Sequence, residues 1–198
     1  MALGLETNQL QGELPKWIWT MLPELTELSL GANQLRGEIP RPSNSGAAGS
    51  RTPRLKNLRL GSNRLQGEIP KELGSFTQLF VLDLRANQFR GEIPRELAEL
   101  RMLMELGLSS NELHGEIPQR LGLGAELTQL SVLDLHRNGL QGEVPAELGA
   151  LPRLGHLLGN PIGLLLSLKT YVVGVKLRAE LAPASHVTSC MTRRAAPS

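Results

Sequence analysis

The residues of this chain that could take part in acid–base or metal chemistry are four histidines and a single cysteine, Cys190. Catalysis needs a nucleophile, an acid–base pair or a set of metal ligands that converge in one pocket. The histidines are not spaced with acids or cysteines in patterns that bind metals, and there is no glycine-rich phosphate loop. We therefore expect no enzyme, no metal site and no cofactor.

Acidic side chains, by contrast, recur at regular intervals. Six glutamates each follow a glycine and precede an apolar residue and a proline: Glu13, Glu38, Glu68, Glu92, Glu116 and Glu143. If the segments that carry them stack at about 4.8 Å per layer, the carboxylates align along one flank. Such a row either attracts a cation or a basic partner weakly, or is a solvated row copied with the repeat.

The elements that position these glutamates are copies of one sequence unit. An asparagine, an apolar residue two positions later and a Gly-Glu-apolar-Pro segment occur together six times, starting at Asn8, Asn33, Asn63, Asn87, Asn111 and Asn138. The basal spacing is 24 residues, as from Asn63 to Asn87, and a period of this length is typical of a solenoid. Because each unit contacts mainly its neighbours, a solenoid offers a long exposed surface rather than a pocket. The repeat therefore favours binding over catalysis.

The leucines of each unit predict its secondary structure. Leu82 and Leu84, like their equivalents, alternate with other residues, which indicates a strand with one buried face. After the proline, a second apolar set such as Leu97 and Leu100 has the spacing of three that suits a short helix. Each unit is therefore predicted to run from strand through turn to short helix.

The full pattern, Leu-x-x-Leu-x-x-Leu-x-Leu-x-x-Asn-x-Leu-x-Gly-x-Ile-Pro, resembles the plant-type leucine-rich repeats, and the match covers residues 3–154. That family includes ectodomains of receptor-like kinases, receptor-like proteins and polygalacturonase-inhibiting proteins. The resemblance implies an α/β repeat solenoid: a right-handed superhelix with a concave parallel sheet and short 3-10 or α helices on the convex side. It also implies a ladder in which each asparagine side chain bonds backbone groups at the inner bend.

Departures from the pattern predict the domain organisation. We expect a solenoid of about six units over residues 1–160 and an irregular cap or tail over 161–198. Residues 41–54 replace one helical segment with a loop insertion. The first unit begins partway through a repeat and lacks the cysteine-paired cap of exported relatives, so its end is expected to favour self-association.

The strongest candidate binding surface is the concave face, at the strand positions between the buried leucines. The residues there differ from unit to unit, which is typical either of a specific surface or of unselected solvent positions. Asp83 with Arg85, and Asp134 with His136 and Arg137, form mixed-charge spots in this set. The predicted ligand-binding residues are Glu27, Ser29, Asn57, Arg59, Asp83, Arg85, Glu105, Ser109, Asp134, His136 and Arg137.

Charge and hydropathy narrow the classes of function. The net charge is +2, and the residues after Gly163 hold four net positive charges, so the repeats are weakly negative and nucleic-acid binding is not expected. No signal peptide or membrane-spanning stretch is recognisable, so the chain as written is expected to be soluble and not exported.

Three interpretations stay open. The first is a protein- or peptide-binding module related to a receptor-like kinase ectodomain, which would act at the cell surface as part of a receptor. The second is a free-standing intracellular scaffold or enzyme-inhibitor module. The third is a partial gene product without a function of its own. The sequence does not identify the ligand, the compartment or the oligomeric state.

Overall fold

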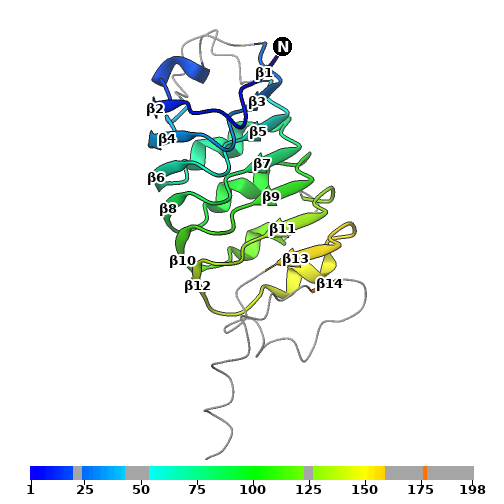
Figure 1. Ribbon diagram of the computed structural model, residues 1–198. Coiled ribbons are helices and arrows are strands. Elements are labelled where there is room, and N and C mark those ends of the chain that lie inside the picture. The colour runs from blue at the N-terminus through cyan, green and yellow to red at the C-terminus, as the bar shows by residue number, and fades with distance from the viewer. Residues whose placement is uncertain (20–23, 43–53, 123–126, 159–175, 178–198) are drawn as a thin grey trace, which may run out of the picture.

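The structure is a computed structural model that describes residues 1–19, 24–42, 54–122, 127–158 and 176–177. Its turns stack one on the next, from the N-terminal turn in blue to the last described turns in yellow (Figure 1). A complete turn runs through a strand, a tight bend, a second strand and a short helix. Equivalent elements of successive turns therefore form two parallel sheets and a row of helices.

The first sheet is built from the Leu-x-Leu segments. Its order is β1 (Ala2–Gly4), β3 (Glu27–Ser29), β5 (Asn57–Arg59), β7 (Val81–Asp83), β9 (Glu105–Gly107), β11 (Val132–Asp134), β13 (His156–Leu158) and β14 (Lys176–Leu177). The central leucines of β3 to β11 are in register and buried, and the flanking residues point to the opposite face. This is the predicted concave parallel sheet, and its outward-pointing residues are called the concave face below.

A second sheet follows the bend and was not predicted, because the sequence was interpreted there as a turn. Its strands are β2 (Gln11–Glu13), β4 (Gln34–Gly37), β6 (Arg64–Glu68), β8 (Gln88–Gly91), β10 (Glu112–Glu116) and β12 (Gly139–Gln141). Apart from β2, each of these short strands contributes one apolar side chain, such as Leu65, to the core. A single buried residue per strand is too short a pattern to show a period of two.

Short 3-10 helices form the third side of the turns, although none is described between β4 and β5. These helices are η1 (Lys16–Trp19), η2 (Lys71–Ser75), η3 (Arg95–Glu99), η4 (Gln119–Leu121) and η5 (Ala146–Ala150). A proline of the Gly-Glu-apolar-Pro segment precedes each helix, where its fixed φ suits a helix start and its missing N–H leaves no donor unsatisfied. The predicted short helices are confirmed, and those in the described residues are all of the 3-10 type.

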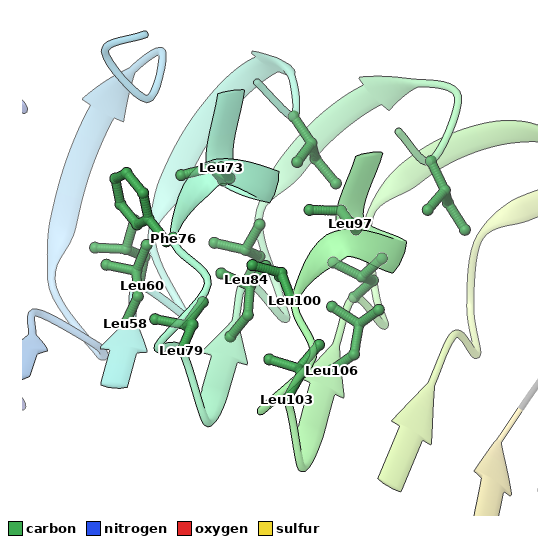
Figure 2. Close-up of a cluster of buried hydrophobic side chains, with 14 of the residues drawn as sticks. Leu58, Leu60, Leu73, Phe76, Leu79, Leu84, Leu97, Leu100, Leu103 and Leu106 are labelled. Atoms are coloured by element: carbon green, nitrogen blue, oxygen red, sulfur yellow. The ribbon is translucent and has the colours of Figure 1, made fainter. Parts of the chain in front are cut away.

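Leucines from the strands and the helices meet in one continuous core. Figure 2 shows Leu73 and Leu97 of η2 and η3 above the side chains that rise from the first sheet, such as Leu58 and Leu106. All four are buried completely. The core is rich in leucine in every turn, so each layer packs on layers that resemble it.

Aromatic packing joins the first turn to the third. The indole of Trp19 meets the ring of Phe76 edge-on, with ring centroids 5.4 Å apart, and its Nε1 donates to the carbonyl of Pro40 at 2.6 Å. Trp19 lies in η1 and Phe76 follows η2, and the structure describes no helix between these two in the chain. The tryptophan therefore provides contact where the repeat has its insertion.

The asparagine ladder implied by the family resemblance is present. In each of five units the asparagine Oδ1 accepts the backbone N–H two residues after the preceding asparagine, as Asn87 Oδ1 does from Leu65 at 3.0 Å. Its Nδ2 donates to a leucine carbonyl of its own unit and to the equivalent carbonyl of the preceding unit. The ladder thus ties each layer to the one before it.

The two outer regions are only partly described. Most of the predicted insertion 41–54 and most of the predicted tail 161–198 lie outside the described residues, so the proposed domain boundary at residue 160 stays a prediction. Within the tail, β14 pairs in parallel with β13. At the other end, β1 and β2 are the outermost strands of the two sheets, and Leu5, Leu10 and Trp17 are exposed there.

Candidate ligand-binding face

The concave face is a grid, because neighbouring strands of the first sheet are in register. Val81, Glu105 and Val132 begin their strands side by side, and Asp83, Gly107 and Asp134 end them side by side. The third row, just beyond the strands, holds Arg85, Ser109 and His136. Residues two positions apart on a strand point to the same face. The grid therefore collects nine side-chain positions from three consecutive turns.

Arg85 is the centre of this grid. Its Nε and Nη2 donate to the two oxygens of Asp83 at 2.9 and 3.1 Å. Nη2 also donates to Glu105 Oε1 at 2.7 Å, and Nη1 lies 3.8 Å from Asp134 Oδ2. A guanidinium offers a planar fork of donors that matches a carboxylate. One arginine thus joins carboxylates from β7, β9 and β11.

Gly107 makes this arrangement possible. A Cβ at Gly107 would lie 2.8 Å from Nε of Arg85, closer than side-chain atoms pack. The arginine therefore lies across β9 in space that any other residue would occupy. Gly61 has a related role beside β7, where a Cβ would lie 3.0 Å from Asp83 Oδ1. The two glycines leave room for the long polar side chains of the neighbouring turn.

Asp134 is held from both sides in the next turn. Ser109 Oγ donates to its Oδ2 at 2.9 Å, and the His136 ring contacts its Oδ1 through Nδ1. The Asp134 side chain is only 4% exposed, whereas that of Arg85 is 37% exposed. A buried carboxylate needs such partners, because burial without hydrogen bonds is costly.

The electrostatics of the grid leave an excess of negative charge. Three carboxylates surround one guanidinium, and a second cation, Arg59, is in register with Asp83 on the adjacent strand, so one negative charge is left over among these acidic and basic groups. The hydrogen bond to Asp83 raises the pKa of the Arg85 guanidinium above its ordinary value, with further contributions from the charges of Asp83, Glu105 and Asp134 and against the effect of partial burial. Arg85 is therefore a permanent cation that is already engaged by its neighbours.

Six of the predicted site residues are brought together in this network. Asp83 contacts Arg85 and Asp134 contacts His136, as the two mixed-charge spots suggested. The sequence did not show that Arg85 connects the two spots through Glu105 and Asp134. The six residues are Asp83, Arg85, Glu105, Ser109, Asp134 and His136.

The remaining predicted residues lie outside the network. Asn57 donates to Glu27 at 3.2 Å on β5 and β3, and Arg59 is in register with Asp83. Arg137 lies in the bend after β11, exposed and with a φ of 53°. In every unit this bend position is left-handed although it is never glycine, a feature that sequence analysis missed.

All the predicted site residues were expected to be exposed, and for three of them this prediction is wrong. Ser109 and Asp134 are buried at 2% and 3% exposure, because they bond to each other and lie beside Arg85 and His136. Ser29 is also buried, since its short side chain lies beside that of Arg59 on the adjacent strand. Small side chains on a sheet are readily covered by longer neighbours.

The part of the chain that the structure describes offers little to other kinds of site. There, no three histidine, cysteine, aspartate or glutamate side chains are grouped so that they could hold a metal ion. Helices long and apolar enough to cross a membrane are likewise absent from the described residues. The six repeated glutamates are all exposed, and they lie in or just after the strands of the second sheet.

Comparison with known proteins identifies the class to which this architecture belongs. A family model for the leucine-rich repeat matches residues 54–76, 78–100 and 129–151. The chain belongs to the leucine-rich-repeat family, and its structural neighbours are plant receptor-kinase ectodomains. No curated protein sequence matches it.

Three solved structures illustrate the likeness. The plant peptide hormone receptor RGFR1, in complex with RGF2, is 35% identical over 80% of this chain and 24% of that chain, with a TM-score of 0.71. The ectodomain of the Arabidopsis receptor kinase HAESA, in complex with an IDA peptide hormone, is 40% identical over 78% and 24%, with a TM-score of 0.69. The BIR3–SERK2 complex from Arabidopsis thaliana gives 32% identity over 71% and 67%, with a TM-score of 0.56. The chain thus spans about a quarter of RGFR1 and of HAESA.

Proposed function

We propose that this chain is a protein- or peptide-binding module that binds its ligand on the concave face and catalyses no reaction. The observation that carries the proposal is the network around Arg85, which spans three strands of an otherwise regular sheet. The leucines and asparagines are needed to build the repeat, but nothing in the repeat requires an arginine that joins three carboxylates. A pre-arranged set of polar groups on a rigid sheet is what a specific binding surface needs.

The comparisons support this proposal. RGFR1 and HAESA are described with bound peptide hormones, RGF2 and IDA. The similarity of sequence and fold favours a relation between this chain and the ectodomain of such a receptor-like kinase. Because the chain spans about a quarter of either receptor, the activity of a whole receptor is part of the proposal and not of the finding.

The geometry of Ser109, Asp134 and His136 favours binding over catalysis. These three residue types form the catalytic triad of hydrolases, in which histidine lies between serine and aspartate and takes the proton of the serine. Here aspartate lies in the middle, since Ser109 donates to Asp134 and His136 contacts the other carboxylate oxygen. The serine is therefore not activated by the histidine, and the group acts as a structural support for the surface.

Selection from a random peptide library displayed on phage tests the proposal. The test variant is Asp83→Ala/Arg85→Ala/Glu105→Ala, which leaves the buried Asp134 with Ser109 and His136. The control variant replaces with alanine two acids and one arginine that are exposed in or next to strands of the second sheet, namely Glu38, Arg64 and Glu112. Peptides selected on the unmodified protein should bind the control variant and lose binding to the test variant, with both variants showing the circular dichroism spectrum of the unmodified protein. Failure to enrich any peptide, or equal binding to both variants, would refute the concave face as the ligand site.

Self-association through the N-terminal turn stays a second, separate prediction. Within the described residues β1 and β2 pair on one side only, and the Nδ2 of Asn8 donates to carbonyls of its own turn alone. Backbone edges of this kind can pair with another strand. Sedimentation velocity over a range of concentrations should show a dimer that Leu5→Lys weakens, and a monomer at every concentration would contradict the prediction.

A further inference from the structure

The grid on the concave face has an apolar border. Phe80 and Met104 precede β7 and β9 in adjacent turns, where the N–H of Met104 donates to the carbonyl of Phe80 at 2.8 Å. Met102 and Met104 are each 44% exposed, and apart from residues at the N-terminal end they are the exposed large apolar side chains of the described chain. Val81 and Val132 are half-buried on either side of Glu105. We call Phe80, Val81, Met102, Met104 and Val132 the apolar rim.

The charged and apolar parts of this surface are adjacent. Val81 and Asp83 lie on one strand two residues apart, and so do Val132 and Asp134, which places each pair on one face about 7 Å apart. Glu105 is in register with both valines. The carboxylate of Glu105, 31% exposed, therefore has an apolar neighbour on each side and Arg85 beyond it.

We propose that this surface selects peptides in which a lysine or arginine lies next to an apolar residue. The inference rests on the proposed function and names the ligand chemistry of the same face. The apolar stem of the basic side chain packs on the valines while its charged end reaches the carboxylates. The apolar neighbour of the ligand packs on Met104, since Lys56 Nζ already lies over the ring of Phe80, 5.9 Å from its centroid. Methionine adapts well to different apolar partners.

The same geometry disfavours an acidic ligand. Arg85 is the cation of the network, and its nitrogens already face Asp83, Glu105 and Asp134. A ligand carboxylate would have to displace one of these neighbours and would meet the carboxylates that remain. Like charges at close range disfavour a wrong partner. A small metal ion is not the complement either, because the described residues hold no group of three metal-ligating side chains.

The peptides enriched on the unmodified protein are the first test. They should contain adjacent basic and apolar residues well above the frequency of the unselected library. Peptides that bind the concave face without this enrichment, or that are enriched in acidic residues, would overturn the inference and leave the proposed function standing. If no peptide binds the concave face, both are refuted.

Two variants then test the residues directly, with an enriched peptide and its Arg→Gln or Lys→Gln analogue as probes. Glu105→Gln keeps an oxygen for Arg85 and removes one charge, so affinity for the basic peptide should fall about threefold to fivefold, the effect of one exposed ion pair. The loss should be smaller for the analogue and at high salt. Glu99→Gln on η3, exposed and outside the grid, is the matched control.

The apolar rim is tested with Met104→Gln, and Leu10→Gln changes an exposed apolar residue at the N-terminal end as its control. Met104→Gln should weaken binding of the basic peptide and of its analogue by the same factor, since it removes apolar contact and no charge. Equal affinities of Glu105→Gln and Glu99→Gln, or no effect of Met104→Gln, would overturn the inference.

Discussion

Replacing Asn87 with alanine is the sharpest test of what holds the turns together. Its Oδ1 accepts from the N–H of Leu65 at 3.0 Å, and its Nδ2 donates to the carbonyls of Leu60 and Leu84, each at 3.1 Å. The asparagine itself is 9% exposed. The substitution removes all of these bonds and leaves no side-chain atom to replace them.

The size of the stability loss depends on which backbone groups keep another hydrogen-bond partner. The carbonyl of Leu60 still accepts from Asn63, and that of Leu84 still accepts from Asn111. The N–H of Leu65, by contrast, loses its acceptor. A buried donor without an acceptor costs about 1–3 kcal/mol, so we expect Asn87→Ala to lower the free energy of unfolding by about that amount. For a domain of this size each kcal/mol lowers the Tm by about 2–4 °C.

Urea unfolding measures the effect, with the fluorescence of the buried Trp19 and far-UV circular dichroism as probes. Asn8→Ala is the matched control, because Asn8 is exposed and its side chain bonds only the carbonyls of Leu5 and Glu6. The control should change the free energy of unfolding by about 0.5 kcal/mol or less. If the two variants lose the same stability, the ladder is not a source of cohesion between turns and the reasoning fails.

Three further changes test the packing. Trp19→Ala should cost about 3–5 kcal/mol through loss of a buried aromatic side chain, against about 1 kcal/mol or less for the exposed Trp17→Ala, both measured by circular dichroism in urea. Gly67→Ala should cost about 1–2 kcal/mol for its φ of 83° plus a clash with Glu38, whose Cγ would lie 2.8 Å from the new Cβ; adding Glu38→Ala should remove the clash alone, and full recovery would contradict the backbone argument. Gly74→Ala should lower the Tm more than Gly67→Ala does, because its Cβ would meet a rigid backbone carbonyl of η3 and not a flexible side chain; an equal Tm would refute the tight packing of η2 on η3.

Much of the fold could be predicted from the sequence, because a repeat presents the same pattern several times. The alternation at Leu82 and Leu84, copied from unit to unit, predicts the strands of the first sheet, and the asparagine at a fixed distance predicts the bend. The second sheet could not be predicted in the same way. Its strands bury at most one apolar side chain each, and their pairing depends on the stacking of the turns, which only the assembled structure shows.

The sequence predicted which residues form the candidate site, but not the contacts that they make across the strands. Asp83 and Arg85 stand two residues apart, so their contact follows from the strand alone. The contact of Arg85 with Asp134 crosses two strands, and it depends on the rotamer of a long side chain. The burial of Ser109 and Asp134 depends on their bond to each other and on the neighbouring Arg85 and His136, which is why both were expected at the surface.

The signal that could have pointed to the connection is Gly107. At the equivalent position the other turns from β3 to β11 carry Ser29, Arg59, Asp83 and Asp134. Gly4 holds this position in β1, where a Cβ would meet nothing within 4 Å. No backbone demand explains Gly107, since its φ does not lie in the left-handed region. What explains it is the side chain of Arg85, which occupies the space of the missing Cβ. In a solenoid the repeated residues explain why the chain folds, and so a position that departs from the repeat without a reason in the backbone is where the structure of a binding surface should be sought.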